Sequence, residues 1–308
     1  MNTLARGGVG LALLTLLSGL GYALINRGSY GLTIFVLFPV LLGGLTSWVF
    51  RPVSGGQAAG WGALSVLAAL CLFLLLGAEG LICIGMAAPL ALPLGALGGV
   101  LAFQARSSKL ATGGIAMLLL SPPGTVAWDA TARPPVFQEQ SMIEIAAPPE
   151  RVWKYVIQFP ELAEPQEWYF RAGLAYPMRA RLEGSGPGAT RYCDFSTGPF
   201  VERIEVSDAP RLLRFRITEN PAPMKELSLY SHVEPKHLHG YFISKVGQFQ
   251  LTRLPNGHTL IEGTSWYQHG LWPAEYWRWW SDAIIHRVHM RVLTHIKALA
   301  EEQGTTPE

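Results

Sequence analysis

Charge is distributed very unevenly along this chain of 308 residues, and this limits what its first part can fold into. Up to Trp128 the single acid is Glu79, and the five basic residues are Arg6, Arg27, Arg51, Arg106 and Lys109. The rest of the chain holds the other 19 basic and 21 acidic residues and all eight histidines. An ionic side chain at the centre of a bilayer costs roughly 2.5–3.5 kcal/mol. The distribution therefore predicts a membrane region followed by a water-exposed domain.

Several apolar stretches in the first part are long enough to cross a bilayer, which takes about 20 residues of α-helix. They are residues 8–25, 30–50, 58–77, 81–103 and 110–128. Pro122 and Pro123 interrupt the fifth, which is tolerable where neighbouring groups satisfy the freed carbonyls. Gly95, Gly98 and Gly99 in the fourth favour close helix packing. The sequence thus predicts four or five transmembrane helices.

The basic residues of the short loops indicate the orientation. The N-terminus and the loops around Arg51 and Arg106 fall on one side with four basic residues, whereas the other side has Arg27 and Glu79. The positive-inside rule then places the N-terminus in the cytoplasm. We expect a multi-pass protein of the cell membrane. Four spans would leave the soluble domain in the cytoplasm, and five would place it on the extracytoplasmic side.

After Asp129 the pattern becomes that of a soluble α+β domain. Strands are predicted at residues 140–146, 178–183, 189–196, 200–207, 211–218, 240–254 and 258–268. Helices are predicted at residues 150–159, 160–167 (a short helix or turn) and 273–302. This order predicts a curved antiparallel sheet around a long C-terminal helix. We therefore divide the chain into a transmembrane region (1–128), a linker (129–137), a domain (138–303) and a tail (304–308).

One segment carries a family resemblance. The run Ile143-Glu-Ile-Ala-Ala-Pro-Pro-Glu-Arg-Val-Trp-Lys-Tyr-Val156, with the element order above, resembles the START-like or SRPBCC superfamily, which includes Bet v 1 and polyketide cyclase/dehydrase-like proteins. The resemblance covers about residues 138–302. It implies a helix-grip fold with an apolar cavity and the binding of a lipid or other hydrophobic molecule. The superfamily has no common catalytic motif, so the resemblance implies no catalytic residues.

Two neighbouring strands combine one acid and one base with apolar residues. Arg191 shares a strand face with Phe195, and Glu202 lies on an apolar face of the next strand. A connection through residues 196–199 would place Phe195 opposite Phe200 and Arg191 diagonal to Glu202. The sequence predicts a buried pair that contacts a ligand, with a structural salt bridge or an exposed outer face as the alternatives.

The long C-terminal helix carries a second polar set. Asp282, His286 and His289 are spaced i, i+4 and i+7, and so lie on one side of it. An aspartate can orient a histidine as a general base, and two histidines with an aspartate can bind a metal. Without an HExxH-type signature we expect neither a metal nor another cofactor. A polar seam beside the sheet is the remaining interpretation.

Three more residues are candidate ligand contacts. His237 and His239 are predicted to lie at the start of a long strand, at the mouth of the cavity. Trp266 in the last strand is predicted to line the cavity, although core packing or contact with the bilayer would also explain the aromatic residues around it. Exposed histidines are common, so a surface position without function is the alternative for the two histidines.

The expected partners are the membrane and a hydrophobic small molecule or lipid. The soluble part is nearly neutral and has no basic stripe, so nucleic-acid binding is not expected. The sequence contains no Walker A motif and no GxSxG nucleophile elbow. The sequence therefore predicts that this chain is a membrane-anchored START-like domain that binds a hydrophobic ligand. A cyclase/dehydratase-type enzyme and a non-enzymatic membrane scaffold are the alternatives, so whether the chain is an enzyme stays open.

Overall fold

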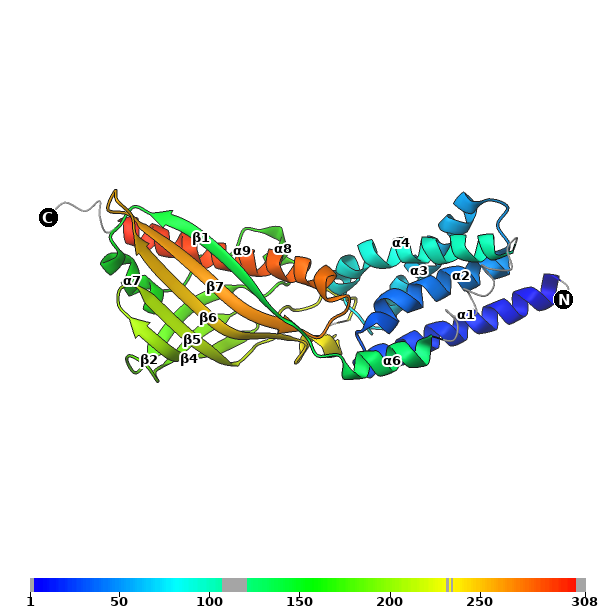
Figure 1. Cartoon of the computed structure of the whole chain (residues 1–308), viewed down its shortest axis with the longest axis horizontal. Helices are drawn as coiled ribbons and strands as arrows, with labels where there is room; N and C mark the ends of the chain where they lie inside the picture. The colour runs from blue at the N-terminus through cyan, green and yellow to red at the C-terminus, as the bar shows by residue number, and fades with distance from the viewer. Residues whose placement is uncertain (1–2, 107–120, 231–232, 234, 303–308) are drawn as a thin grey trace. The chain divides into compact units, whose positions relative to one another are not determined.

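The computed structural model describes residues 3–106, 121–230, 233 and 235–302 (Figure 1). The chain forms two compact units. The first, the helical unit, contains Met1–Arg133, Glu226–His237 and Gly270–Glu275. The second, the sheet unit, contains Pro134–Lys225, Leu238–His269 and Tyr276–Glu308. Two short segments from the second half of the sequence thus belong to the helical unit.

Apolar helices build the helical unit. They are α1 (Thr3–Asn26), α2 (Phe38–Phe50) with the π-helical turn η1 (Thr33–Leu37) before it, α3 (Gly55–Leu75), α4 (Leu81–Ala105) and α6 (Pro122–Thr131). Within the described residues, three stretches are long and apolar enough to cross a membrane: Thr33–Phe50, Gly55–Leu75 and Leu81–Ala105. A shorter apolar helix covers Leu14–Asn26. Most of the fifth predicted span, 110–128, lies outside the described residues.

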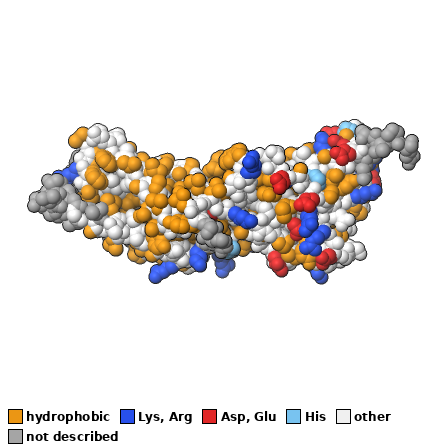
Figure 2. All heavy atoms as spheres, turned by 180° about the vertical axis from the view of Figure 1, so that it is seen from behind, with side chains coloured by type: hydrophobic (Ala, Val, Ile, Leu, Met, Phe, Trp, Pro, Cys, Tyr) orange, Lys and Arg blue, Asp and Glu red, His pale blue; other side chains and the backbone are white. Residues whose placement is uncertain are grey.

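Glycine brings α4 into backbone contact with its neighbours. A Cβ atom added to Gly98 would lie 2.0 Å from the Val40 carbonyl oxygen, and one added to Gly99 would lie 2.1 Å from that of Ala58. These positions confirm the close helix packing predicted from the glycines. The outward side chains over the helices are mainly hydrophobic, whereas acids and bases gather over the sheet unit (Figure 2). The helical unit therefore has the surface that a hydrocarbon environment requires.

Distant carboxylates cap two helices of this unit. Asp129 in α6 accepts hydrogen bonds from the backbone N–H groups of Leu32 (2.8 Å) and Thr33 (3.0 Å) before η1. Glu226 accepts from the N–H groups of Ile82 (3.1 Å) and Cys83 (3.2 Å) at the start of α4. A helix leaves its first N–H groups without partners, and a carboxylate there satisfies them and complements the helix dipole.

The sheet unit is a curled antiparallel sheet of seven strands in the order β1-β7-β6-β5-β4-β3-β2, with the long helix α9 (Figure 1). Its strands are β1 (Val136–Ile145), β2 (Pro177–Glu183), β3 (Thr190–Phe195), β4 (Gly198–Asp208), β5 (Leu212–Glu219), β6 (Phe242–Arg253) and β7 (Thr259–His269). Its α-helices are α7 (Pro149–Ile157), α8 (Trp168–Arg171) and α9 (Ala274–Glu302). The 3₁₀ turn η2 (Lys236–Leu238) has its first two residues in the helical unit. The predicted α+β class with a helix-grip arrangement is confirmed.

Two local predictions were wrong. The segment 160–167, predicted as a short helix or turn, is irregular chain, and a short helix forms after it at α8. The β3–β4 hairpin turns over two residues, Ser196 and Thr197, so Gly198 and Pro199 belong to β4. Phe195 therefore pairs with Gly198 rather than with Phe200. Gly198 has a φ of 137°, which lets the chain reverse this tightly.

The core of the sheet unit lies between the sheet, α7 and the C-terminal half of α9. Leu293, Ile296 and Ala300 of α9 pack with Val152 and Val156 of α7, and none of these side chains is more than marginally exposed. The strands contribute Ile145, Cys193, Ile204, Leu213, Phe215, Leu251 and Ile261. The apolar core thus fills one end of the space under α9, and the polar residues of α9 come at the other end.

Candidate functional site

A polar seam joins the N-terminal half of α9 to strands β1 and β7. The two ring nitrogens of His289 contact hydroxyls from different strands, Nε2 lying 2.8 Å from Ser265 Oγ and Nδ1 lying 3.2 Å from Ser141 Oγ. The same Ser141 hydroxyl lies 2.8 Å from His286 Nδ1. We define the seam by Ser141, Ser265, Asp282, His286 and His289. Hydrogen bonds link the two serines and the two histidines beneath the helix, and Asp282 lies one turn before His286 on α9.

The aspartate of the seam is bonded to neither histidine, although a general-base interpretation of the i,i+4 spacing would require such a bond. Asp282 accepts a 2.5 Å hydrogen bond from the Tyr267 hydroxyl and a 3.2 Å bond from Arg278 Nε. His286 lies instead near Glu139 of β1, with 3.7 Å between Nδ1 and Oε1. The i,i+4 spacing permits an Asp–His contact, but groups on the facing strands satisfy both side chains. The sequence did not identify Tyr267, Ser141 or Ser265 as site residues. Strand alternation shows that alternate residues share a face, but it does not show which face of the sheet lies against α9.

The electrostatics of the seam favour neutral groups. Burial, together with the neighbouring His286, lowers the pKa of His289 to about 4. Burial and the hydrogen bond to Asp282 raise the pKa of Tyr267 above its ordinary value. Burial raises the pKa of Glu139, and the charge of Asp282 adds to this. His289 is thus a neutral imidazole at pH 7 that donates one hydrogen bond and accepts another, which suits recognition of an uncharged polar group.

Arg191 and Glu202 form a buried ion pair in the apolar core. They are 2% and 5% exposed, and the Arg191 guanidinium donates to Glu202 Oε2. The two residues lie directly opposite in the β3–β4 ladder rather than diagonally, because the hairpin turn is shorter than predicted. Burial raises the pKa of Glu202, and the Arg191 guanidinium opposes that rise. The predicted burial of the pair is confirmed, and its contact with a ligand stays a prediction.

Aromatic rings surround the guanidinium of this pair. Its carbon Cζ lies 5.5–5.9 Å from the ring centroids of Phe159, Phe215 and Phe249. Arg191 Nε also donates a 3.0 Å hydrogen bond to the Ile157 carbonyl at the end of α7. These contacts favour a structural role, since they tie α7 to the sheet. A cation over aromatic faces gains further attraction when it is desolvated.

The structure separates two other candidates from the seam. Phe195 lies at the end of β3 and packs against Phe200, with 4.7 Å between the ring centroids. Trp266 lies on the opposite face of β7 from Ser265, and its ring lies under the Arg214 guanidinium at 5.2 Å. The prediction that Trp266 lines the space under α9 was therefore wrong, because successive strand residues point to opposite faces.

The two loop histidines differ in their surroundings. His237 belongs to the 3₁₀ turn η2 rather than to a strand, and it is 7% exposed. His239 is exposed and precedes β6, which begins at Phe242. The buried His237 belongs to the helical unit, a position that no sequence pattern predicts. Their predicted contact with a ligand stays a prediction.

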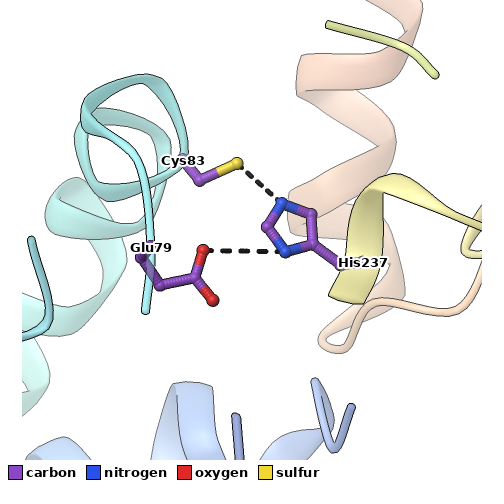
Figure 3. Close-up of side chains that lie close together, drawn as sticks. All are labelled: Glu79, Cys83 and His237. Carbon is purple, nitrogen blue, oxygen red and sulfur yellow. Dashed lines mark hydrogen bonds and ion pairs between the residues drawn. The ribbon is translucent and has the colours of Figure 1, made fainter. Parts of the chain in front are cut away.

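A cluster of chemically reactive side chains surrounds His237 (Figure 3). Cys83 Sγ lies 2.8 Å from Nε2 of the ring, and Glu79 Oε2 lies 3.6 Å from Nδ1. The Tyr30 hydroxyl donates a 2.6 Å bond to Glu79 Oε1, and the Tyr30 ring meets the imidazole edge-on at 4.7 Å. The signal available in the sequence was Glu79 itself, the single acid of the first 128 residues.

Part of the chain is similar to known proteins. Residues 124–266 match the family described as polyketide cyclase / dehydrase and lipid transport. Similar solved structures include an aromatase/cyclase from a Streptomyces species, at 14% identity over 56% of this chain and 98% of that one, with a TM-score of 0.36. Norcoclaurine synthase from Thalictrum flavum is 12% identical over 57% and 100%, with a TM-score of 0.35. A protein from Nitrosospira multiformis is 17% identical over 55% and 100%, with a TM-score of 0.34. No curated protein matches the chain.

Proposed function

We propose that this chain is a membrane-anchored protein that binds a hydrophobic small molecule or lipid, because residues 124–266 match the family described as polyketide cyclase / dehydrase and lipid transport. The observation that carries the proposal is the polar seam between the concave sheet and α9. Ligand sites for such molecules are mostly apolar and contain a few convergent polar groups that fix the orientation. The seam supplies such groups beside an otherwise apolar core.

The seam also indicates what kind of polar group the ligand carries. Ser141, Ser265 and the neutral His289 are uncharged donors and acceptors. An uncharged hydroxyl or carbonyl would replace or extend their hydrogen bonds, whereas a carboxylate would enter without a cationic partner among these three. We therefore propose a ligand with an apolar body and a neutral polar head. Binding of Asp282, His286 and His289 to this head is part of the proposal.

The alternative of a cyclase/dehydratase-type enzyme is favoured by one observation. His286 is exposed at the edge of the seam, beside the Ser141 hydroxyl and the Glu139 carboxylate. An accessible imidazole next to a carboxylate can transfer protons to a bound substrate. In that case, mass spectrometry of ligand recovered from the wild type and from His286→Gln would find different compounds. Recovery of the same compound from both would favour binding alone.

Filling the seam tests the proposed ligand site. In Ser265→Trp an indole replaces the hydroxyl beside His289, and we expect binding of a fluorescent fatty-alcohol probe to the detergent-solubilised protein to weaken by about tenfold or more. Glu262→Trp is the matched control, because Glu262 lies on the outer face of the same strand and bonds to the Gln140 side chain. Equal binding by the two variants would exclude the seam as the ligand site.

The membrane region accounts for the proposed anchorage. We propose that residues 1–128 form it, with a fifth span, so that the domain at 138–303 lies on the extracytoplasmic side. Three of the described helices are long and apolar enough to cross a membrane. The basic residues of the predicted short loops support the orientation.

Cysteine labelling tests this topology. Pro255 lies at the exposed tip of the β6–β7 hairpin, and we expect Pro255→Cys to react with a membrane-impermeant maleimide in intact cells. The parent chain, with Cys71, Cys83 and Cys193, gives the background. Labelling that requires cell lysis would instead support four spans and a cytoplasmic domain.

A further inference from the structure

The cluster around His237 gathers three different metal-binding atoms inside the helical unit. Glu79, Cys83 and His237 each offer one donor atom, and these atoms all lie within 4.8 Å of one another. Glu79 comes from the connection before α4, Cys83 from the first turn of α4, and His237 from η2 (Figure 3). Two segments about 150 residues apart in sequence thus converge on one point.

Two of these groups have buried polar atoms whose hydrogen bonding the surrounding packing does not satisfy. Glu79 and His237 are each 7% exposed, and both Glu79 Oε2 and His237 Nδ1 lack a hydrogen-bond partner. A buried polar atom without a partner costs about 1–3 kcal/mol. Two such atoms face each other across 3.6 Å, which is the arrangement expected of groups that can share a third partner.

A second carboxylate adds negative charge at the same place. Glu226 is half-buried, and its carboxylate accepts the backbone N–H groups of Ile82 (3.1 Å) and Cys83 (3.2 Å). Within the described residues, neither carboxylate has a Lys or Arg partner among the ion pairs. Of these described residues, His237 is the basic side chain that faces Glu79, at 3.6 Å. A bound cation would satisfy the charge that no Lys or Arg offsets.

We propose that Glu79, Cys83 and His237 form a binding site for a divalent transition-metal ion of the Zn²⁺ class. Thiolate, imidazole and carboxylate are the donors that Zn²⁺ takes, and three protein donors leave a fourth position for water or another ligand. Glu226 caps the start of α4 by accepting the backbone N–H groups of Ile82 and Cys83. This inference is independent of ligand binding by the sheet unit.

Binding requires small movements of the donors. Tetrahedral Zn²⁺ with bonds of about 2.0–2.3 Å holds neighbouring donors roughly 3.3–3.7 Å apart. Here Sγ and Nε2 are 2.8 Å apart, and the Glu79 carboxylate faces the other ring nitrogen. The ion would separate Cys83 from Nε2, and the Glu79 carboxylate would turn toward the same nitrogen. The Tyr30 hydroxyl would keep its bond to the second carboxylate oxygen.

The same three residues have the connectivity of a thiol nucleophile, its base and an orienting acid. Two features weigh against that use. The N–H groups of Ile82 and Cys83, the nearest candidates for stabilising an oxyanion, are already bonded to Glu226. The Glu226 carboxylate beside the thiol also opposes formation of a thiolate, and a metal ion would favour the thiolate instead.

Metal binding to the full-length protein in detergent tests the proposal. After treatment with a chelator and its removal, we expect one Zn²⁺ per chain in competition with a fluorescent zinc chelator. Cys83→Ser and His237→Gln are each expected to weaken binding by about tenfold or more, whereas the controls Cys71→Ser and His239→Gln bind as the wild type does. Cys71 and His239 are exposed. Equal affinity in all five proteins would overturn the proposal.

Cobalt provides a readout that needs no variant. Co²⁺ bound at this site should give the near-ultraviolet charge-transfer band of a cobalt–thiolate bond, and Zn²⁺ should abolish it. Binding should also protect Cys83 from alkylation by iodoacetamide, as judged by peptide mass spectrometry. A Co²⁺ spectrum without the thiolate band would overturn the proposal even if Cys83→Ser failed to fold. Alkylation of Cys83 that is rapid and unaffected by Zn²⁺ would also overturn it and favour a reactive thiol.

Discussion

Replacing Arg191 with methionine is expected to lower the free energy of unfolding of the sheet unit by about 3–5 kcal/mol. The change leaves the Glu202 carboxylate 5% exposed and without the guanidinium that it accepts from. Glu202→Leu should cost a similar amount, because it leaves a buried guanidinium among three phenylalanine rings. Each single variant strands one charge where water cannot reach it.

The double variant separates the burial of charge from the loss of packing. Arg191→Met with Glu202→Leu removes both charges, and apolar side chains of similar size fill the same space. We expect it to be more stable than either single variant, since replacement of a buried ion pair by hydrophobic residues is often nearly neutral. The measurement is denaturant unfolding of the full-length protein in detergent, followed by tryptophan fluorescence.

An exposed ion pair in the same sheet unit provides the control. Arg211 and Asp208 contact each other at 2.5 Å, but their side chains are 75% and 45% exposed. The corresponding changes, Arg211→Met and Asp208→Leu, should each lower the free energy of unfolding far less than the changes at Arg191 and Glu202 do, because water screens an exposed ion pair. Small and additive losses at Arg191 and Glu202 as well would contradict the burial of that pair.

The sequence was most informative where one physical constraint acts over many residues. Exclusion of charge from hydrocarbon marked the apolar helices, and strand alternation marked the sheet. The Pro255-Asn256-Gly257 turn was equally clear, because Gly257 has a φ of 80°, which favours glycine. These signals are local or compositional. They do not depend on contacts with distant elements, so the fold class could be predicted from the sequence alone.

Register and site geometry were harder to predict because they depend on partners far away in the sequence. Glu226 caps a helix that starts about 145 residues earlier, as the separation to Ile82 shows. His237 belongs to the helical unit although its sequence context resembles the start of a strand. Asp282 follows the i,i+4 rule but bonds to Tyr267 across the interface. No periodic pattern encodes such pairings.

Glycines at the contacts of α4 should be among the least replaceable residues of the helical unit. Gly98→Ala would put a methyl group 2.0 Å from the Val40 carbonyl oxygen, a distance that only movement of a whole helix can relieve. Overpacking of this kind costs about 1–3 kcal/mol, and contact with backbone leaves little room to adapt. We expect a lower midpoint of thermal unfolding in detergent and a smaller yield of folded protein.

Gly85→Ala on the same helix is the matched control. A Cβ atom at Gly85 meets nothing within 4 Å, and alanine is favoured over glycine within a helix by about 1 kcal/mol. The same substitution at the two positions should therefore change stability differently. Gly85→Ala should be neutral or stabilising, and Gly98→Ala should be destabilising. Loss of stability in both variants would point to the bending of α4 near Pro89 and Pro93 rather than to helix contact. Tolerance of Gly98→Ala would show that α4 does not approach α2 so closely.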